Sequence, residues 1–101
     1  MPVIAQFDFP FQGPFGDDAV VALGDLARSI VDEPGFRWKV WTEGSAAGEA
    51  GGIYLFDDEA AARAYVDKHT GRLAEFGITE IRAKIFDVNE GLTNITRGPI
   101  D

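Results

Sequence analysis

The side chains with the most chemical potential lie on one stretch, where a single histidine stands between a tyrosine and an arginine. Tyr65 precedes His69 by four residues and Arg72 follows it by three, so a helix would place them close together on one side. His69 is the only imidazole in the chain, and imidazole ordinarily titrates nearest to neutral pH. It is therefore a candidate for proton transfer. The alternatives are a histidine satisfied by a backbone carbonyl or a carboxylate, and an Arg72 that belongs to a solvated helix face.

Several other kinds of site fail on counting. One histidine and no cysteine cannot build a zinc site or a two-histidine iron site within one chain. Haem ligation by His69 would need a large cavity. Gly48, Gly51 and Gly52 precede an expected strand rather than a helix, so they do not form a phosphate-binding loop. The sequence therefore predicts no metal and no cofactor.

Four strands and two helices are expected to position these residues. Residues 3–9 alternate between apolar and polar side chains, which is typical of a half-buried strand, and Asp17 or Asp18 can cap the first helix. The expected strands cover residues 3–9, 36–43, 49–56 and 78–88, and the helices cover 17–31 and 57–76. This β-α-β-β-α-β order predicts an α+β, ferredoxin-like fold with an antiparallel sheet. The chain is one domain over residues 1–101, with residues 89–101 as a polar C-terminal tail without a clear period.

The alternation of side chains divides the expected sheet into two layers. An apolar layer should meet the helices, and it includes Trp38. A second layer mixes charged residues with Trp41, Tyr54 and Phe86. Exposed aromatic patches usually mark an interface, so we expect these three residues to lie in a homodimer interface formed sheet to sheet around a two-fold axis. The alternative is a monomer in which arginine and lysine stems cover the aromatic rings.

Composition narrows the partners and the location. The 101 residues are 46% apolar and carry a formal net charge of -8, which disfavours nucleic acid and anionic membranes because both require clustered cations. An RNA-recognition sheet is disfavoured as well, since the expected third strand has no cation in Gly51–Phe56. The N-terminus lacks a signal-peptide pattern, and no apolar run approaches the ~20 residues of a membrane span. We expect a cytoplasmic protein.

Five segments resemble one family over essentially the whole chain. They are GPFG (13–16), EPGFRWKVWTE (33–43), EAGGIYLF (49–56), KHTGRL (68–73) and FDVNEGLTNIT (86–96). Together they resemble the bacterial YdhR-like monooxygenase family. The resemblance implies a ferredoxin-like chain that dimerises into an α+β barrel. It also implies similarity to antibiotic-biosynthesis monooxygenases, which oxidise aromatic polyketides without metal, flavin or haem.

The chemistry that this resemblance implies makes specific demands on a pocket. An electron-rich aromatic substrate must be deprotonated and must then give an electron to molecular oxygen, so the protein must supply a dry aromatic site, a base and stabilisation of the anion. We expect Phe36 and Trp38 to provide stacking surfaces, and Tyr65 a hydrogen-bonding wall. His69 is the expected proton acceptor and Arg72 the expected counter-charge.

Asn89 has two possible places, at the pocket rim or at the subunit contact, and a backbone role in a turn is the alternative for it. For the chain as a whole, the leading function is a cofactor-independent monooxygenase acting on a small aromatic or quinol-like compound. The alternative is a non-catalytic ligand-binding or stress-associated dimer module that keeps the pocket.

Overall fold

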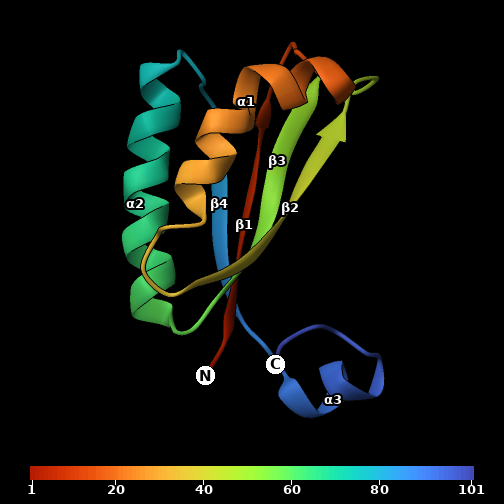
Figure 1. Cartoon of the computed structure of the whole chain (residues 1–101), viewed down its shortest axis with the longest axis vertical. Coiled ribbons are helices and arrows are strands. Elements are labelled where there is room, and N and C mark those ends of the chain that lie inside the picture. The colour runs from red at the N-terminus through yellow and green to blue at the C-terminus, as the bar shows by residue number, and fades with distance from the viewer.

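The computed structural model describes residues 1–101 as two layers, with two helices packed on one face of a four-stranded antiparallel sheet (Figure 1). The strand order is β2-β3-β1-β4, and every neighbouring pair is antiparallel. The elements are β1 (Val3–Pro10), α1 (Gly16–Ile30), β2 (Phe36–Gly44), β3 (Glu49–Phe56), α2 (Glu59–Glu75), β4 (Arg82–Asp87) and α3 (Glu90–Ile95). The predicted α+β, ferredoxin-like β-α-β-β-α-β fold is therefore confirmed.

The core between the helices and the sheet is largely aromatic. Phe7 from β1 meets Tyr54 from β3 edge-on, with ring centroids 5.6 Å apart, and meets Tyr65 from α2 in the same way at 6.2 Å. Edge-to-face pairs of this kind add about 0.5–1.5 kcal/mol to the stabilisation from burial alone. The core therefore fixes α2 firmly against the centre of the sheet.

The helix α2 is capped at its N-terminus and stopped by a turn at its C-terminus. The Asp58 side chain accepts a hydrogen bond from the Ala61 backbone N–H at 2.8 Å, which satisfies one of the free amides of the first turn. Beyond the C-terminus, Gly77 has a φ of 83°, a left-handed conformation that glycine adopts without steric cost. This clear start and stop explain why the sequence pattern predicted α2 so closely.

A β-bulge at the start of β2 changes which side chains face the helices. Phe36 pairs with Phe56, but the next pair is Trp38 with Leu55, so Arg37 is an extra residue. Because side chains alternate along a strand, one extra residue reverses the faces of everything after it. The prediction that Trp38 lies on the helix side is therefore wrong.

The predicted places of two other aromatic residues are also wrong. Trp41 pairs with Gly52, Tyr54 pairs with Ala5, and both aromatic residues lie on the helix side. Tyr54 is fully buried beside Tyr65 and belongs to the core. Only Phe86 lies on the outer face, 47% exposed, as the pattern of β4 predicted.

The C-terminal tail is ordered around the short helix α3, although its sequence shows no period. Its last residues return to the outer face at the start of β2. Trp38 Nε1 donates to the Pro99 carbonyl at 2.7 Å, and the Arg37 guanidinium donates to the Ile100 carbonyl, also at 2.7 Å. Ile100 is buried, so the tail covers this part of the sheet. Figure 1 shows α3 beyond the end of the sheet, away from α1 and α2.

The observed elements differ from the expected ones at two further ends. The strand β4 begins at Arg82 rather than at residue 78, because Glu80 turns the chain with a φ of 54°. The helix α1 begins at Gly16, and its N-cap residue, Phe15, makes no side-chain cap hydrogen bond. Asp17 and Asp18 lie in the first turn instead, where their charges favour the positive end of the helix. None of the helices is long and apolar enough to cross a membrane.

Candidate active site

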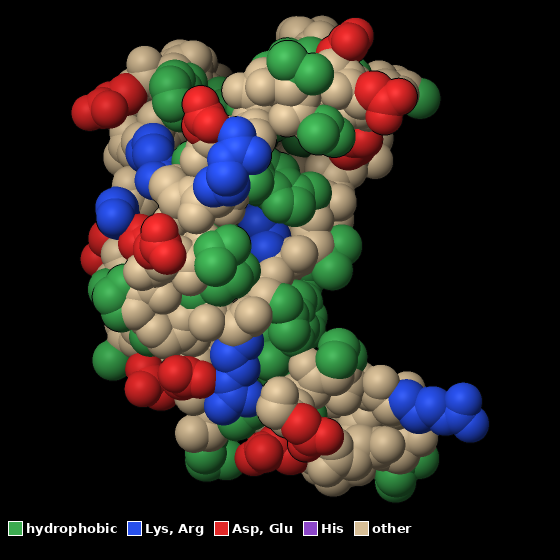
Figure 2. All heavy atoms as spheres, in the orientation of Figure 1, with side chains coloured by type: hydrophobic (Ala, Val, Ile, Leu, Met, Phe, Trp, Pro, Cys, Tyr) green, Lys and Arg blue, Asp and Glu red, His purple; other side chains and the backbone are tan.

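A cavity of about 910 Å³ lies between α1 and the sheet. This volume falls within the range of pockets that enclose small organic ligands. Its walls are mainly apolar and come from β1, α1, β2, β3 and the end of α2. They include Phe7, Phe9, Phe11, Leu23, Leu26 and Trp41. Figure 2 shows hydrophobic and basic side chains beside one another in the middle of this face.

The helix α1 forms the outer wall of the cavity and joins the packed core only near its C-terminal end. Only Ile30, at its C-terminal end, is buried. Val20 lines the cavity but is 70% exposed. A helix with an apolar stripe ordinarily buries that stripe against a neighbour. The apolar residues of α1 therefore face a space that a ligand can fill.

Two tyrosines meet at the inner end of the cavity, where Tyr54 lines it and Tyr65 lies behind Tyr54. The hydroxyl oxygens of Tyr54 and Tyr65 are 3.1 Å apart, within hydrogen-bond distance. Burial raises the pKa of Tyr65 to about 12, although the nearby charge of Arg72 opposes this. Burial also raises the pKa of Tyr54, and Tyr65 adds to this shift. Both phenols are therefore protonated at neutral pH, and only one of the two protons can lie between the two oxygens. Tyr65 is the donor of this hydrogen bond, so the proton without a partner belongs to Tyr54.

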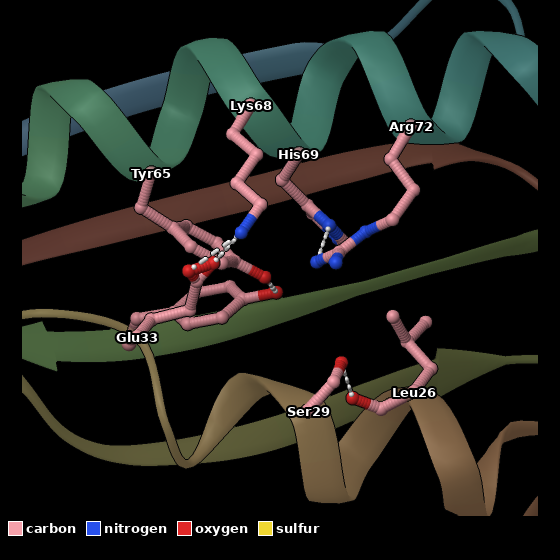
Figure 3. Close-up of polar contacts among 8 residues, drawn as sticks. Leu26, Ser29, Glu33, Tyr65, Lys68, His69 and Arg72 are labelled. Atoms are coloured by element: carbon pink, nitrogen blue, oxygen red, sulfur yellow. Dashed lines mark hydrogen bonds and ion pairs between the residues drawn. The ribbon is translucent and has the colours of Figure 1, made fainter.

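His69 and Arg72 lie next to the tyrosines on α2, as Figure 3 shows. A guanidinium nitrogen of Arg72 is 2.9 Å from His69 Nδ1. Because guanidinium only donates hydrogen bonds, Nδ1 must be the acceptor and the ring proton belongs to Nε2. Burial, followed by the charges of Lys39 and Arg72, lowers the pKa of His69 to about 3. The geometry thus gives His69 a neutral ring whose lone pair is already engaged, which disfavours the expected role of proton acceptor.

Lys39 also lines the cavity, although it was not among the residues expected there from the sequence. Its Nζ lies 3.2 Å from the centroid of the Trp41 ring and 4.6 Å from that of Tyr54. No carboxylate is within ion-pair distance of this amine. Burial, with a smaller contribution from the charge of Arg72, lowers the pKa of Lys39 to about 7. The cavity therefore contains an amine that can exchange a proton near neutral pH.

Gly52 creates the space that Lys39 occupies. A Cβ at this position would lie 2.5 Å from Lys39 Cε and 3.2 Å from Tyr54 Cε1. Any residue other than glycine would thus displace the lysine stem from its place between the two aromatic rings. The sequence does carry a signal for this arrangement, a Lys-X-Trp pattern opposite a strand glycine. The bulge hides which face the pattern occupies.

The cavity has two cations and little negative charge to balance them. The buried Arg72 Nε has no hydrogen-bond partner. Of the two carboxylates at the cavity edge, Asp25 pairs with Arg28 and Glu43 accepts hydrogen bonds from the Gly16 backbone N–H. Glu33, near Tyr65, is paired with Lys68 at 2.6 Å (Figure 3). No group of three His, Cys, Asp or Glu residues could hold a metal ion.

The structure separates the residues that the sequence predicted for the pocket. Arg72 and His69 line the cavity, whereas Tyr65 does not line it and reaches it only through its hydrogen bond to Tyr54. Phe36 packs against Phe56 and does not line the cavity. Two further residues lie elsewhere, Trp38 on the outer face and Asn89 at the start of α3. The Asn89 side chain accepts a hydrogen bond from the Leu92 backbone N–H, the backbone role that was its alternative.

Two solved structures share this fold. One is a "putative antibiotic biosynthesis monooxygenase" from Deinococcus radiodurans, with 13% identity, a TM-score of 0.60, and coverage of 86% of this chain and 92% of the other. The second is a mutant of SnoaB, a cofactor-independent oxygenase from Streptomyces nogalater, with 15% identity, a TM-score of 0.61, and coverage of 87% and 93%. A search of curated proteins found no match.

The two structures are too low in sequence identity to assign a family, but a family model does so. The model described as "Putative mono-oxygenase ydhR" matches residues 4–99. This range includes all residues of the four paired strands except Val3. It also includes α1 and α2, which border the cavity. The protein therefore belongs to the ydhR mono-oxygenase family.

Proposed function

We propose that this protein is a cofactor-independent monooxygenase that acts on a small aromatic, quinol-like compound in the cavity between α1 and the sheet. The observation that carries the proposal is the cavity itself: an apolar space of about 910 Å³ with tyrosine, lysine, histidine and arginine side chains at one end. Membership of a mono-oxygenase family supports the reaction type. The fold shared with a cofactor-independent oxygenase is consistent with it.

The first step would be loss of a proton from the substrate. A phenol or an activated methylene becomes a far better electron donor to O2 once it is deprotonated. Lys39 is the group suited to accept this proton, because its amine faces the cavity and its pKa is lowered to about 7. A general base works best when its pKa lies near the working pH. The resulting anion would lie near the charge of Arg72, which favours it.

The later steps need oxygen and a proton donor. The substrate anion transfers one electron to O2, and the two radicals combine to form a peroxide on the substrate carbon. Loss of water from the peroxide then leaves a carbonyl. One atom of O2 enters the product, the other leaves as water, and the substrate supplies two hydrogens, so no external reductant is needed. The tyrosine pair, Tyr54 and Tyr65, is suited to donate a proton to the peroxide because both phenols are protonated.

Oxygen consumption with a panel of hydroquinones and anthrone-like compounds tests this proposal. We expect turnover by the parent protein, a loss of about tenfold to a thousandfold in Lys39→Met, and a smaller loss in Tyr65→Phe. Lys84→Met is the matched control, because Lys84 lies on the outer face of the sheet. Binding of these compounds without oxygen consumption would favour the non-catalytic ligand-binding module instead.

We also propose that the protein is a homodimer that pairs the outer faces of two sheets. The outer face carries a row of paired apolar residues, Trp38, Leu55, Ile4 and Phe86. Neither α1 nor α2 covers this row. The C-terminal tail contacts its Trp38 end and Leu55 is already buried, but Phe86 is 47% exposed and Val40 beside the row is 54% exposed. A second copy related by a two-fold axis would bury the same patch on both subunits. This interface differs from the one expected from sequence, since of the three predicted residues only Phe86 belongs to it.

A further inference from the structure

The inner end of the cavity holds two basic side chains that no carboxylate neutralises. Lys39 and Arg72 both line the cavity, and neither forms an ion pair with a carboxylate. One guanidinium nitrogen of Arg72 donates a hydrogen bond to His69 Nδ1, and the buried Nε of Arg72 has no hydrogen-bond partner. Buried cations are ordinarily paired or hydrogen-bonded, because an unpaired charge in an apolar surrounding is costly.

The rest of the molecule makes this arrangement more specific. The chain has 17 acidic residues against 9 basic ones. Carboxylates are therefore plentiful in this chain, yet none forms an ion pair with Lys39 or Arg72. The nearby acids are engaged elsewhere: Asp25 with Arg28, and Glu33 with Lys68. The acidic surface surrounds an inner site with the opposite sign. A ligand with an anionic oxygen would complete the site that the protein leaves incomplete.

We propose that Lys39 and Arg72 form an oxyanion-recognition site, and that the natural ligand is an aromatic compound bound through an ionised acidic oxygen, either a carboxylate or an enolate. The inference deepens the proposed function, because it rests on the same cavity and names the class of substrate. The aromatic body would lie against Trp41 and Phe7, and the oxyanion between Lys39 and the guanidinium of Arg72. For an enolate, the ammonium of Lys39 is the product of the proton transfer proposed above, whereas a carboxylate would bind to Lys39 that is already protonated. The neutral tyrosine pair would donate the remaining hydrogen bond.

The site has a pH signature that follows from the groups around Lys39. These are Tyr54 on β3, together with Tyr65, His69 and Arg72 on α2, and Asp25 and Glu43 at the cavity edge. The pKa values of both tyrosines are raised and that of His69 is lowered to about 3. Among these shifted groups, only Lys39 titrates near pH 7. Affinity for a permanently ionised ligand should therefore be constant below about pH 7 and fall by up to about tenfold per pH unit above it.

Calorimetric titration with naphthoate and naphthamide tests the inference apart from turnover, since neither compound serves as an oxidisable quinol. Naphthoate carries a carboxylate, and naphthamide is its neutral counterpart of nearly the same shape. We expect naphthoate to bind about tenfold to a hundredfold more tightly at pH 6, the range of a charge-assisted hydrogen bond. A hydroxynaphthoquinone, ionised at neutral pH, separates enolate from carboxylate recognition. Quenching of Trp41 fluorescence in a Trp38→Phe variant, which leaves Trp41 as the one tryptophan, reports that the ligand enters this cavity.

Variants identify the residue responsible. Lys39→Met and Arg72→Gln should each remove most of the preference for naphthoate over naphthamide. Lys39→Arg should keep the preference but remove its decline above pH 7, because arginine stays charged. Lys84→Met, on the outer face, should change neither. Equal binding of the acid and the amide by the parent, or a preference that survives Lys39→Met, would overturn the inference. A clear preference without oxygen consumption by any quinol would leave the anion site standing and refute the oxygenase.

Discussion

His69 shows how a buried environment changes the chemistry of a residue. The ring is almost fully buried, stacked on Tyr65 and bonded to Arg72 through Nδ1. An imidazole in water would be half protonated near pH 6.5, but burial, followed by the charges of Lys39 and Arg72, lowers the pKa of His69 and keeps its ring neutral. We infer that His69 positions Arg72 and does not accept the substrate proton.

The lowered pKa of His69 predicts a particular dependence of stability on pH. Between its unfolded value of 6.5 and its folded value of about 3, the unfolded chain binds the proton and the folded chain does not. Stability is therefore fully present above pH 6.5 and falls, by about 1.4 kcal/mol per pH unit, as the pH drops through this range. His69→Asn keeps an acceptor for Arg72 but cannot titrate. Urea unfolding between about pH 6 and pH 4 should thus show a shallower loss of stability in the variant, and identical slopes would contradict this account.

The sequence could predict where His69 lies but not how it behaves. The helical spacing of Tyr65, His69 and Leu73 predicted an inward stripe, and the structure buries all three. The pKa of a side chain depends on charges brought from other elements, here mainly Lys39 on β2. That lysine is thirty residues away in the chain, and nothing in the local pattern of α2 could reveal it.

At the level of elements, a single extra residue in β2 decides which side chains of that strand face the cavity. The bulge at Arg37 sends Trp38 to the outer face and brings Lys39 and Trp41 to the cavity. Alternation alone predicts a continuous strand, since a bulge leaves no reliable mark on the hydrophobic pattern. The same ambiguity affected β3, where two alternating sets, Ile53 with Leu55 and Tyr54 with Phe56, are both apolar enough to face a core.

The glycines of β3 offer a test at this scale. In Gly52→Ala, the added methyl group would displace Lys39 from Trp41 without touching backbone atoms of another strand. We expect naphthoate affinity and oxygen consumption to fall at least about tenfold, while the free energy of unfolding changes by less than about 1 kcal/mol. Fluorescence titration and urea unfolding would measure the two effects.

Two other glycine substitutions provide the controls. Gly71→Ala, in open space on α2, should leave binding unchanged and stabilise the helix by about 0.5–1 kcal/mol. Gly51→Ala would drive its methyl group into the Phe7 backbone carbonyl and should destabilise the fold strongly. Unchanged ligand affinity in Gly52→Ala would show that the position of Lys39 does not matter for binding.

At the scale of the whole molecule, the two faces of the sheet have different roles. The helix side holds the cavity, and the outer side carries apolar residues that only the C-terminal tail partly covers. The order of elements and the split βαβ topology were predictable because Pro and Gly mark the turns after β1, before β2, between β2 and β3 and after α2, and acidic residues mark the start of α2. The tail was not, because its helix is short and its last residues are held by hydrogen bonds to β2, which lies far from them in the sequence.

The proposed dimer predicts a response to charge on the outer face. Val40→Glu and Phe86→Glu place a carboxylate in the apolar row and should convert a 22 kDa dimer, twice the 11.0 kDa chain, into a monomer at micromolar concentration. Val21→Glu, on the exposed side of α1, should leave the dimer intact. Sedimentation equilibrium decides the matter, and a parent protein that is monomeric at these concentrations would refute the outer-face dimer.

The fate of isotope-labelled dioxygen tests the central claim most directly, namely that the cavity between α1 and the sheet is the site of a cofactor-free oxygenation. The chelator-treated protein is incubated with labelled O2 and an oxidisable anthrone, and the product is analysed by mass spectrometry. We expect one labelled oxygen atom per product molecule from the parent and Lys84→Met. Lys39→Met, and Leu23→Trp, which fills the cavity, should show little label. No label in the parent, or equal label in all four proteins, would contradict the claim.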